Sequence, residues 1–354
     1  MKKRIVALAC AMTMATALLA GCGNSSSETK AETTAETTAE STTETAGESA
    51  AASSSDKKYA VILKTQATDF WTKMWEGVED KAEEMGIQVD IYSAQSEEDF
   101  EGQVAILEKC INDGYDGIAV APLSASNLVS TVAKAYKAGI TIVNIDEKLD
   151  MDEMEKQGGA VVGFVTTDNV AVGNKGAGYI VENVEEGSKV AIIEGKAGNA
   201  SGEDRAKGAK EAFEAAGLEV VGSVPGDWDR QKALDAATSF IQQNPDLKAI
   251  FCNNDDMALG VVEAVEEAKK DILVVGVDGI GEAYDSIRAG KLDATVDSFG
   301  YYMSQVATEV TLRVLAGQDI PRVTHTPQAL IDKTNVDKDA KDIIGWTDPK
   351  YVSE

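Results

Sequence analysis

Histidine is almost absent from this sequence of 354 residues, which contains only His325. The four cysteines form no CxxC pair, and none of them lies near that histidine. Structural zinc sites need grouped Cys and His ligands, and a catalytic base is most often a histidine with a Ser or Cys partner, which His325 lacks. The sequence therefore predicts no metal site and no histidine-based nucleophilic catalysis.

Nucleotide-binding and hydrolase motifs are missing as well. Residues 195–202 follow an apolar run, as a phosphate-binding loop does, but they lack the Gly-Lys-Ser/Thr ending and the GxGxxG spacing. No GxSxG is present. Paired carboxylates occur, but they fit the role of hydroxyl acceptors better than that of a glycosidase pair. We expect no enzyme and no cofactor.

Basic residues are scarce, because 33 Lys and Arg stand against 60 Asp and Glu and give a formal net charge of -27. Such a chain repels nucleic acid and anionic lipid, and no basic stripe offsets the repulsion. A helix-turn-helix, which a sugar-responsive repressor would need at its start, is also absent. The sequence predicts no nucleic-acid partner and no charge-driven membrane binding.

What is present begins with a secretory pattern. Residues 2–4 are Lys-Lys-Arg, and residues 5–20 are almost entirely apolar or small. They lead to the run LAGC at 19–22, which resembles the lipobox of bacterial lipoproteins. The alternative is an ordinary signal peptide with a chance cysteine. We expect residues 1–21 to be a signal peptide and Cys22 to be lipidated.

A low-complexity segment follows at 22–58, built from Ser, Thr, Ala, Glu and Gly. Its lack of large apolar residues prevents burial that would offset the entropy of ordering, so we expect a disordered tether. Its length suits a Gram-positive envelope, with the protein held by lipid at the outer face of the cell membrane. Cys110 and Cys252 then remain, as buried thiols or, alternatively, as a disulfide.

From residue 59 onward, continuous apolar runs alternate with helical periodicity, which indicates parallel sheets covered on both faces. The length of this alternation is too great for one core and predicts two α/β lobes. Residues 118–146 and 250–278 each read strand, helix, strand and a closing Asp, which indicates an internal duplication. The last elements are expected to return to the first lobe.

Ligands bind beyond the carboxyl ends of strands in open parallel sheets, so the candidate ligand-binding residues are those at these positions. They hold aromatic rings, carboxylates and amides, the residue types that recognise sugars through C–H faces and hydroxyls. Asp146 and Asp278 could instead cap helices, and Phe70 and Trp71 could belong to the core. The candidates include Lys64, Phe70, Trp71, Asp146, Glu147, Glu203, Trp228, Asn254, Asp278 and Ser298.

Several long runs carry a resemblance over most of the folded chain. They lie at 60–65, 117–124, 144–148, 164–173, 190–202, 227–230 and 254–260. They resemble the ribose-type periplasmic sugar-binding family. The resemblance implies a periplasmic binding protein fold of type I, with two doubly wound parallel-sheet lobes joined by a three-strand hinge. The implied lobes are 59–165 plus 299–326 and 166–298 plus 327–354.

The resemblance also implies that one monosaccharide, an allose- or ribose-like aldose or ketose, binds between the lobes of a monomer. Phe70, Trp71 and Trp228 would sandwich the ring, and an ABC transporter permease would be the partner. A ligand-presenting sensor for a membrane receptor is the alternative. The residues implied to hold hydroxyls are Lys64, Asp146, Glu147, Glu203, Asn254 and Asp278.

Two positions depart from the family pattern. Thr68 stands where the family has a ligand-contacting Asn, and Ser298 stands where it has a hinge Gln that also bonds the sugar. Both replacements shorten a polar side chain, and a site built for hydrogen bonds discriminates strongly among hydroxyl patterns. The sequence therefore leaves open which sugar binds.

Overall fold

The computed structural model describes residues 57–345. The predicted signal peptide, Cys22, nearly all of the tether and the end of the tail lie outside the described residues. Among those described, no helix is long and apolar enough to cross a membrane.

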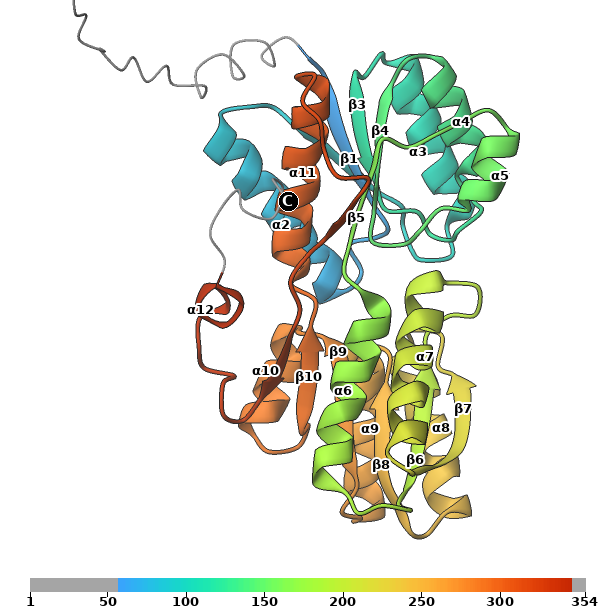
Figure 1. The fold of residues 1–354 in the computed structure, drawn as a ribbon, viewed down its shortest axis with the longest axis vertical. Helices are drawn as coiled ribbons and strands as arrows, with labels where there is room; N and C mark the ends of the chain where they lie inside the picture. The colour runs from blue at the N-terminus through green and yellow to red at the C-terminus, as the bar shows by residue number, and fades with distance from the viewer. Residues whose placement is uncertain (1–56, 346–354) are drawn as a thin grey trace, which may run out of the picture. The chain divides into compact units, whose positions relative to one another are not determined.

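Two six-stranded sheets form the framework, each with helices on both faces (Figure 1). The first sheet is parallel throughout, in the order β11-β5-β4-β3-β1-β2. Its strands and helices are β1 (Tyr59–Leu63), α2 (Asp69–Met85), β2 (Asp90–Ser93), α3 (Phe100–Asn112), β3 (Gly117–Val120), α4 (Val129–Lys137), β4 (Thr141–Ile145), α5 (Met151–Lys156), β5 (Gly163–Thr166), α11 (Gly300–Leu315) and β11 (Val323–His325).

The second sheet has the order β12-β10-β9-β8-β6-β7, with β12 antiparallel at its edge. Its elements are α6 (Asn169–Asn183), β6 (Lys189–Glu194), α7 (Ala200–Ala215), β7 (Glu219–Pro225), α8 (Arg230–Gln243), β8 (Leu247–Cys252), α9 (Asp255–Ala268), β9 (Leu273–Asp278), α10 (Gly281–Arg288), β10 (Ala294–Asp297), β12 (Ala329–Asp332) and α12 (Ala340–Ile344). The predicted fold class of two doubly wound parallel-sheet lobes is confirmed.

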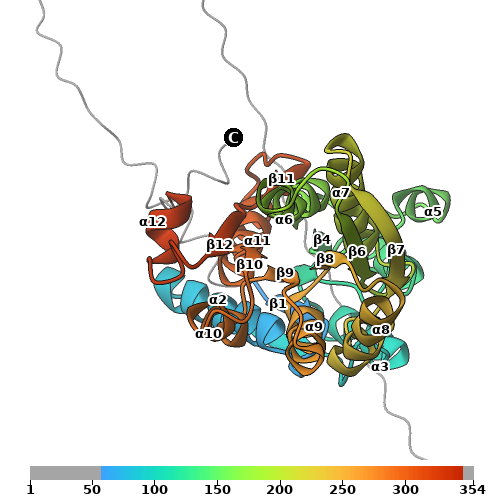
Figure 2. The ribbon, with the colours of Figure 1, turned by 90° about the horizontal axis from the view of Figure 1, so that it is seen from below.

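Helices form where the apolar spacing requires it. In α2 the buried side chains include Trp71, Met74, Val78 and Ala82, spaced three or four residues apart, so that one stripe faces the sheet. Gly86 then ends the helix at φ 65°, a left-handed conformation that glycine adopts without steric penalty. In Figure 2, α2 and α11 lie on one side of the first sheet, and the chain returns there with α11 after β10 of the second sheet.

The duplication in the sequence appears in the topology. Strands β3 and β4 occupy the same places in the first sheet as β8 and β9 do in the second. The chain passes between the sheets near residues 167, 299 and 327, which makes three connecting segments. The carboxyl ends of β4 and β9 are therefore equivalent positions in the two lobes.

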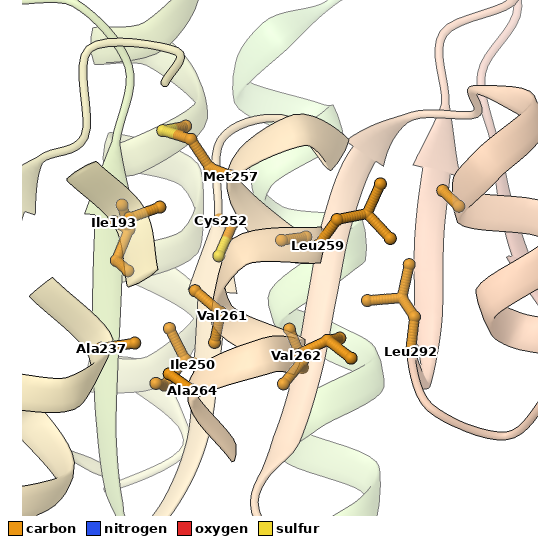
Figure 3. Packing of buried hydrophobic residues seen from close by; sticks show 14 of the residues in the cluster. Ile193, Ala237, Ile250, Cys252, Met257, Leu259, Val261, Val262, Ala264 and Leu292 are labelled. Atoms are coloured by element: carbon orange, nitrogen blue, oxygen red, sulfur yellow. The ribbon is translucent and has the colours of Figure 1, made fainter. Parts of the chain in front are cut away.

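Both remaining cysteines are free thiols in buried surroundings. Cys252 lies among Ile193, Ile250 and Met257 in the second lobe (Figure 3). Cys110 lies in a core cluster of the first lobe. Burial raises the pKa of both thiols, so both are held as small apolar side chains.

Candidate functional site

A cavity of about 320 Å³ lies where the carboxyl ends of the two sheets meet. This volume is at the small end of the ~300–1,000 Å³ typical of small-molecule pockets. Both lobes contribute to its wall. The predicted site residues on the wall are Lys64, Phe70, Trp71, Asp146, Trp228, Asn254 and Asp278.

The aromatic rings reach the cavity from both lobes. Phe70 and Trp71 open α2 and lie edge to face, with ring centroids 5.1 Å apart. Trp71 is buried, whereas Phe70 is partly exposed and packs against core clusters of both lobes. From the other lobe, Trp228 is half-buried and donates through Nε1 to Asn199 Oδ1 at 3.2 Å. The two rings of α2 are thus neither purely core nor purely ligand groups.

Two glycines allow the Trp228 ring to lie close to the backbone at the cavity wall. A Cβ on Gly195 would stand 2.1 Å from the Trp228 ring, and one on Gly202 would stand 3.0 Å from it. The backbone at Asp227 and Trp228 is left-handed, with φ 55° and 63°. Only glycine allows the indole to approach this closely, so the loop glycines and the strained turn together fix the ring at the cavity wall.

Strained backbone also presents the two matched carboxylates. Asp146 follows β4 at φ 58°, and Asp278 ends β9 at φ 122°. Neither caps a helix, because the N-caps of α5 and α10 are Asp150 and Ile280. The helix-cap alternative is therefore wrong for both residues. L-residues adopt these φ values at a cost of about 1–3 kcal/mol each, and such strain concentrates at functional sites.

Lys64 neutralises the first-lobe side of the cavity. Its Nζ lies 3.3 Å from Asp146 Oδ2, 3.9 Å from Glu147 Oε2 and 5.3 Å from the Trp71 ring centroid. Burial alone lowers the pKa of Lys64, but the carboxylates of Asp146, Glu97 and Glu147 outweigh that effect and leave it raised. The lysine is therefore a paired cation, not a free charge for an anionic ligand.

Arg205 is the paired cation on the second-lobe side of the cavity. It was not predicted from the sequence. Its guanidinium donates to Asn169 Oδ1 at 2.9 Å, to the Asn253 carbonyl at 2.7 Å and to Asp278 Oδ1 at 3.0 Å. Burial raises the pKa of Asp278 to about 7, although Arg205 acts in the opposite direction. A signal existed, because Arg205 stands on the apolar i, i+4 stripe that continues through Ala209 and Phe213.

Three predicted residues lie off the cavity wall. Glu147 is fully buried and accepts from Ala200 N at 2.6 Å and Ser201 Oγ at 2.7 Å. Glu203 is exposed in the first turn of α7, where its Oε1 accepts from Gly198 N. Ser298 is buried beside β10, and its Oγ has no hydrogen-bond partner among the described residues.

Asn254 has one side-chain atom that caps a helix and another that has no hydrogen-bond partner among the described residues. Its Oδ1 accepts from Met257 N at 3.0 Å and caps α9. Its Nδ2 donates a hydrogen bond to no described residue, and Asn254 lines the cavity. The sequence reading also did not single out the loop after β2, where Glu97 accepts from Trp71 Nε1 at 2.9 Å.

The arrangement can bind a polar ligand. Within residues 57–345, no three His, Cys, Asp or Glu side chains are grouped to hold a metal ion. The cations at the wall are both paired with carboxylates. The cavity therefore presents aromatic faces and carboxylate acceptors, two of them ion-paired, which favour hydroxyl-rich uncharged ligands.

Comparisons with known proteins agree with this geometry. Residues 59–319 match the family described as "Periplasmic binding protein domain". A D-allose-binding periplasmic protein of Escherichia coli (strain K12) is 55% identical over 243 residues, covering 68% of this chain and 78% of the relative. A ribose import binding protein of Bacillus subtilis (strain 168) is 32% identical over 282 residues, covering 79% and 89%.

Solved structures are similar in fold. An ABC transporter solute-binding protein from Actinobacillus succinogenes 130z with bound D-allose has a TM-score of 0.76 at 31% identity, covering 79% of this chain and 99% of the other. A solute-binding protein from Agrobacterium vitis with bound D-fucose has a TM-score of 0.74 at 28% identity, covering 81% and 99%.

Proposed function

The chain belongs to the periplasmic binding protein domain family, and from that premise we propose that it captures a neutral sugar between its lobes and delivers it to an ABC importer. The observation that carries the proposal is the cavity wall, which is lined by Phe70 and Trp71 of one lobe and by Trp228 of the other. Asp146 and Asp278 supply the matched acceptors. Aromatic faces accommodate the C–H faces of a sugar ring, and charged acceptors strengthen hydrogen bonds from hydroxyls.

Charge pairing favours a neutral sugar over a phosphorylated or acidic one. Lys64 is engaged by Asp146, and Arg205 by Asp278. An anionic ligand would have to compete with those carboxylates and would also face the excess of acidic groups on the wall, including Glu97 and Asp256. A neutral polyhydroxylated ring meets neither obstacle.

The direct test is calorimetric titration of the purified domain with D-allose, D-ribose, D-glucose, D-galactose and D-psicose, each beside its available phosphate ester. The expected result is one-to-one binding of at least one free sugar and none of its phosphate. Tighter binding of the phosphate would contradict the neutral-ligand proposal. Mass analysis of the recovered sugar should show it unchanged, as expected for a carrier and not an enzyme.

We propose that Cys22 carries the lipid that holds the protein at the outer face of the membrane, as a monomer on a tether. Net negative charge repels anionic lipid, so acyl chains supply the attachment. Cys22→Ser should release the protein from the membrane fraction of a Gram-positive host. Retention of the variant would contradict the anchor, and a dimeric mass in light scattering would contradict the monomer.

A further inference from the structure

A second cavity of about 250 Å³ adjoins the first. The two share much of their lining, and the shared residues are Ala67, Thr68, Trp228, Asp229 and Asp256. Beyond this common boundary the second cavity extends to Asp69, Arg230, Ile280 and Glu282. The site therefore consists of two connected compartments, and the proposed monosaccharide occupies only the first.

Thr68 and Trp228 both belong to the lining that the two compartments share. Thr68 is the N-cap residue of α2, and its side chain makes no capping hydrogen bond. Trp228 has its indole fixed by Gly195 and Gly202. The common boundary therefore carries a short hydroxyl-bearing side chain and a flat aromatic ring, and no bulky side chain was needed at position 68 to cap the helix.

The wall of the second compartment carries no unpaired cation among the described residues. Arg230 donates to Glu282 at 2.8 and 2.7 Å and lies 3.2 Å from Asp256. Asp69 and Asp229 add carboxylate acceptors. Such a wall repels phosphate and carboxylate groups and accepts hydrogen bonds from hydroxyls, while the Trp228 ring offers a stacking surface.

We propose that the protein takes a glycoside, with one sugar ring in the first compartment and a neutral hydroxyl-rich substituent, such as a second sugar ring, in the second. The linkage lies along the shared boundary, beside Thr68 and Trp228. The inference rests on the proposed function, because the first compartment must hold a sugar for the second to hold its substituent.

The test compares each monosaccharide that binds with its α- and β-glucosyl glycosides by calorimetric titration. At least one glycoside is expected to bind as tightly as the free sugar, within about threefold. Failure of all the glycosides, at more than a hundredfold weaker affinity, would overturn the second compartment and leave the monosaccharide function intact. Failure of every sugar and glycoside would overturn both.

A variant separates the compartments. Asp69→Phe places a larger apolar side chain on the wall of the second cavity, and Asp69 does not line the first. Glycoside affinity should fall tenfold or more while monosaccharide affinity stays within threefold, and the retained binding shows that the variant is folded. Glu83→Phe, at an exposed acidic position on α2 outside both cavities, is the matched control. Unchanged glycoside affinity in Asp69→Phe would contradict the proposal.

Discussion

The Glu147 carboxylate accepts a hydrogen bond from the backbone N–H of Ala200 at 2.6 Å, across the boundary between the two lobes. Glu147 follows β4 of the first sheet, whereas Ala200 begins α7 of the second lobe. The helix N-cap residue, Asn199, makes no side-chain capping bond within α7 and instead donates to the Leu123 carbonyl of the first lobe. A side chain of one lobe therefore caps a helix of the other. Separation of the two lobes would break this hydrogen bond.

Replacing Glu147 with Gln should weaken ligand binding by about tenfold, or ~1.4 kcal/mol, because closure loses a charged acceptor at the α7 N-terminus. The change removes charge but keeps the shape of the side chain. Calorimetry with the tightest-binding sugar measures the loss. Glu155→Gln, an exposed position on α5 of the same lobe, is the control. Equal affinities for the two variants would show that the interlobe cap does not contribute to closure.

Trp228→Ala should abolish sugar binding while leaving the protein folded. The half-buried ring packs on Gly195 and Gly202 at the wall of the cavity, so its loss removes a stacking face but little of the core. Intrinsic fluorescence and titration report both properties. Trp75→Ala, at a position of α2 that does not line the cavity, serves as the control. Affinity retained within about tenfold, ~1.4 kcal/mol, would mean that the binding cleft lies elsewhere.

Gly195→Ala should lower sugar affinity without a matching loss of thermal stability. The added Cβ would lie 2.1 Å from the Trp228 ring, so the indole has to move away from its position at the wall. Gly178→Ala in α6 is the opposite case, because nothing lies within 4 Å of its added Cβ. That helical substitution should raise stability, by roughly 0.5–1 kcal/mol, and leave affinity unchanged. If both variants bind alike, the glycine does not position the ring.

Asp297→Asn should increase stability at alkaline pH and leave it nearly unchanged at acid pH. Burial raises the pKa of Asp297 from 3.8 to about 7, despite hydrogen bonds from Tyr284 and Phe299 N. The folded state therefore binds more protons than the unfolded state between these pH values, so the wild type loses stability as pH rises through them.

The difference in melting temperature between Asp297→Asn and the wild type should widen from pH 4 to about pH 7 and then level off. One pKa unit corresponds to ~1.4 kcal/mol, so a shift of a few degrees is expected. Thermal denaturation of both proteins at a series of pH values checks the trend. A difference that stays flat across this range would contradict a protonated Asp297 in the hinge.

Much of the fold follows from local patterns. Continuous apolar strands such as β1 are buried along their whole length, which indicates a sheet covered on both faces. The repeated strand–helix–strand pattern in the sequence predicted that β4 and β9 occupy equivalent positions. The division of the last strand-forming run into two strands was not predictable from the local pattern. The run from Val323 onward divides into β11 and β12 in different sheets, because Pro327 lacks an N–H and interrupts pairing.

Site residues that lie at the carboxyl ends of strands could be predicted from the sequence. Asp146 and Asp278 end equivalent strands, so reading strand ends placed both at the cavity. Arg205 was missed because it extends from the middle of a helix, and its role depends on Asn169 and Asn253, which are distant in sequence. The interlobe contacts of Glu147 depend on how the lobes close, which no local pattern encodes.

Calorimetric and thermal titration of the purified domain against the panel of free sugars tests the central claim most directly. A bound sugar at about 100 times its Kd should stabilise the protein by ~2.7 kcal/mol, and Trp228→Ala should remove both the heat and the shift in melting temperature. Absence of binding heat and of any stabilisation with every sugar, in a correctly folded protein, would contradict the account.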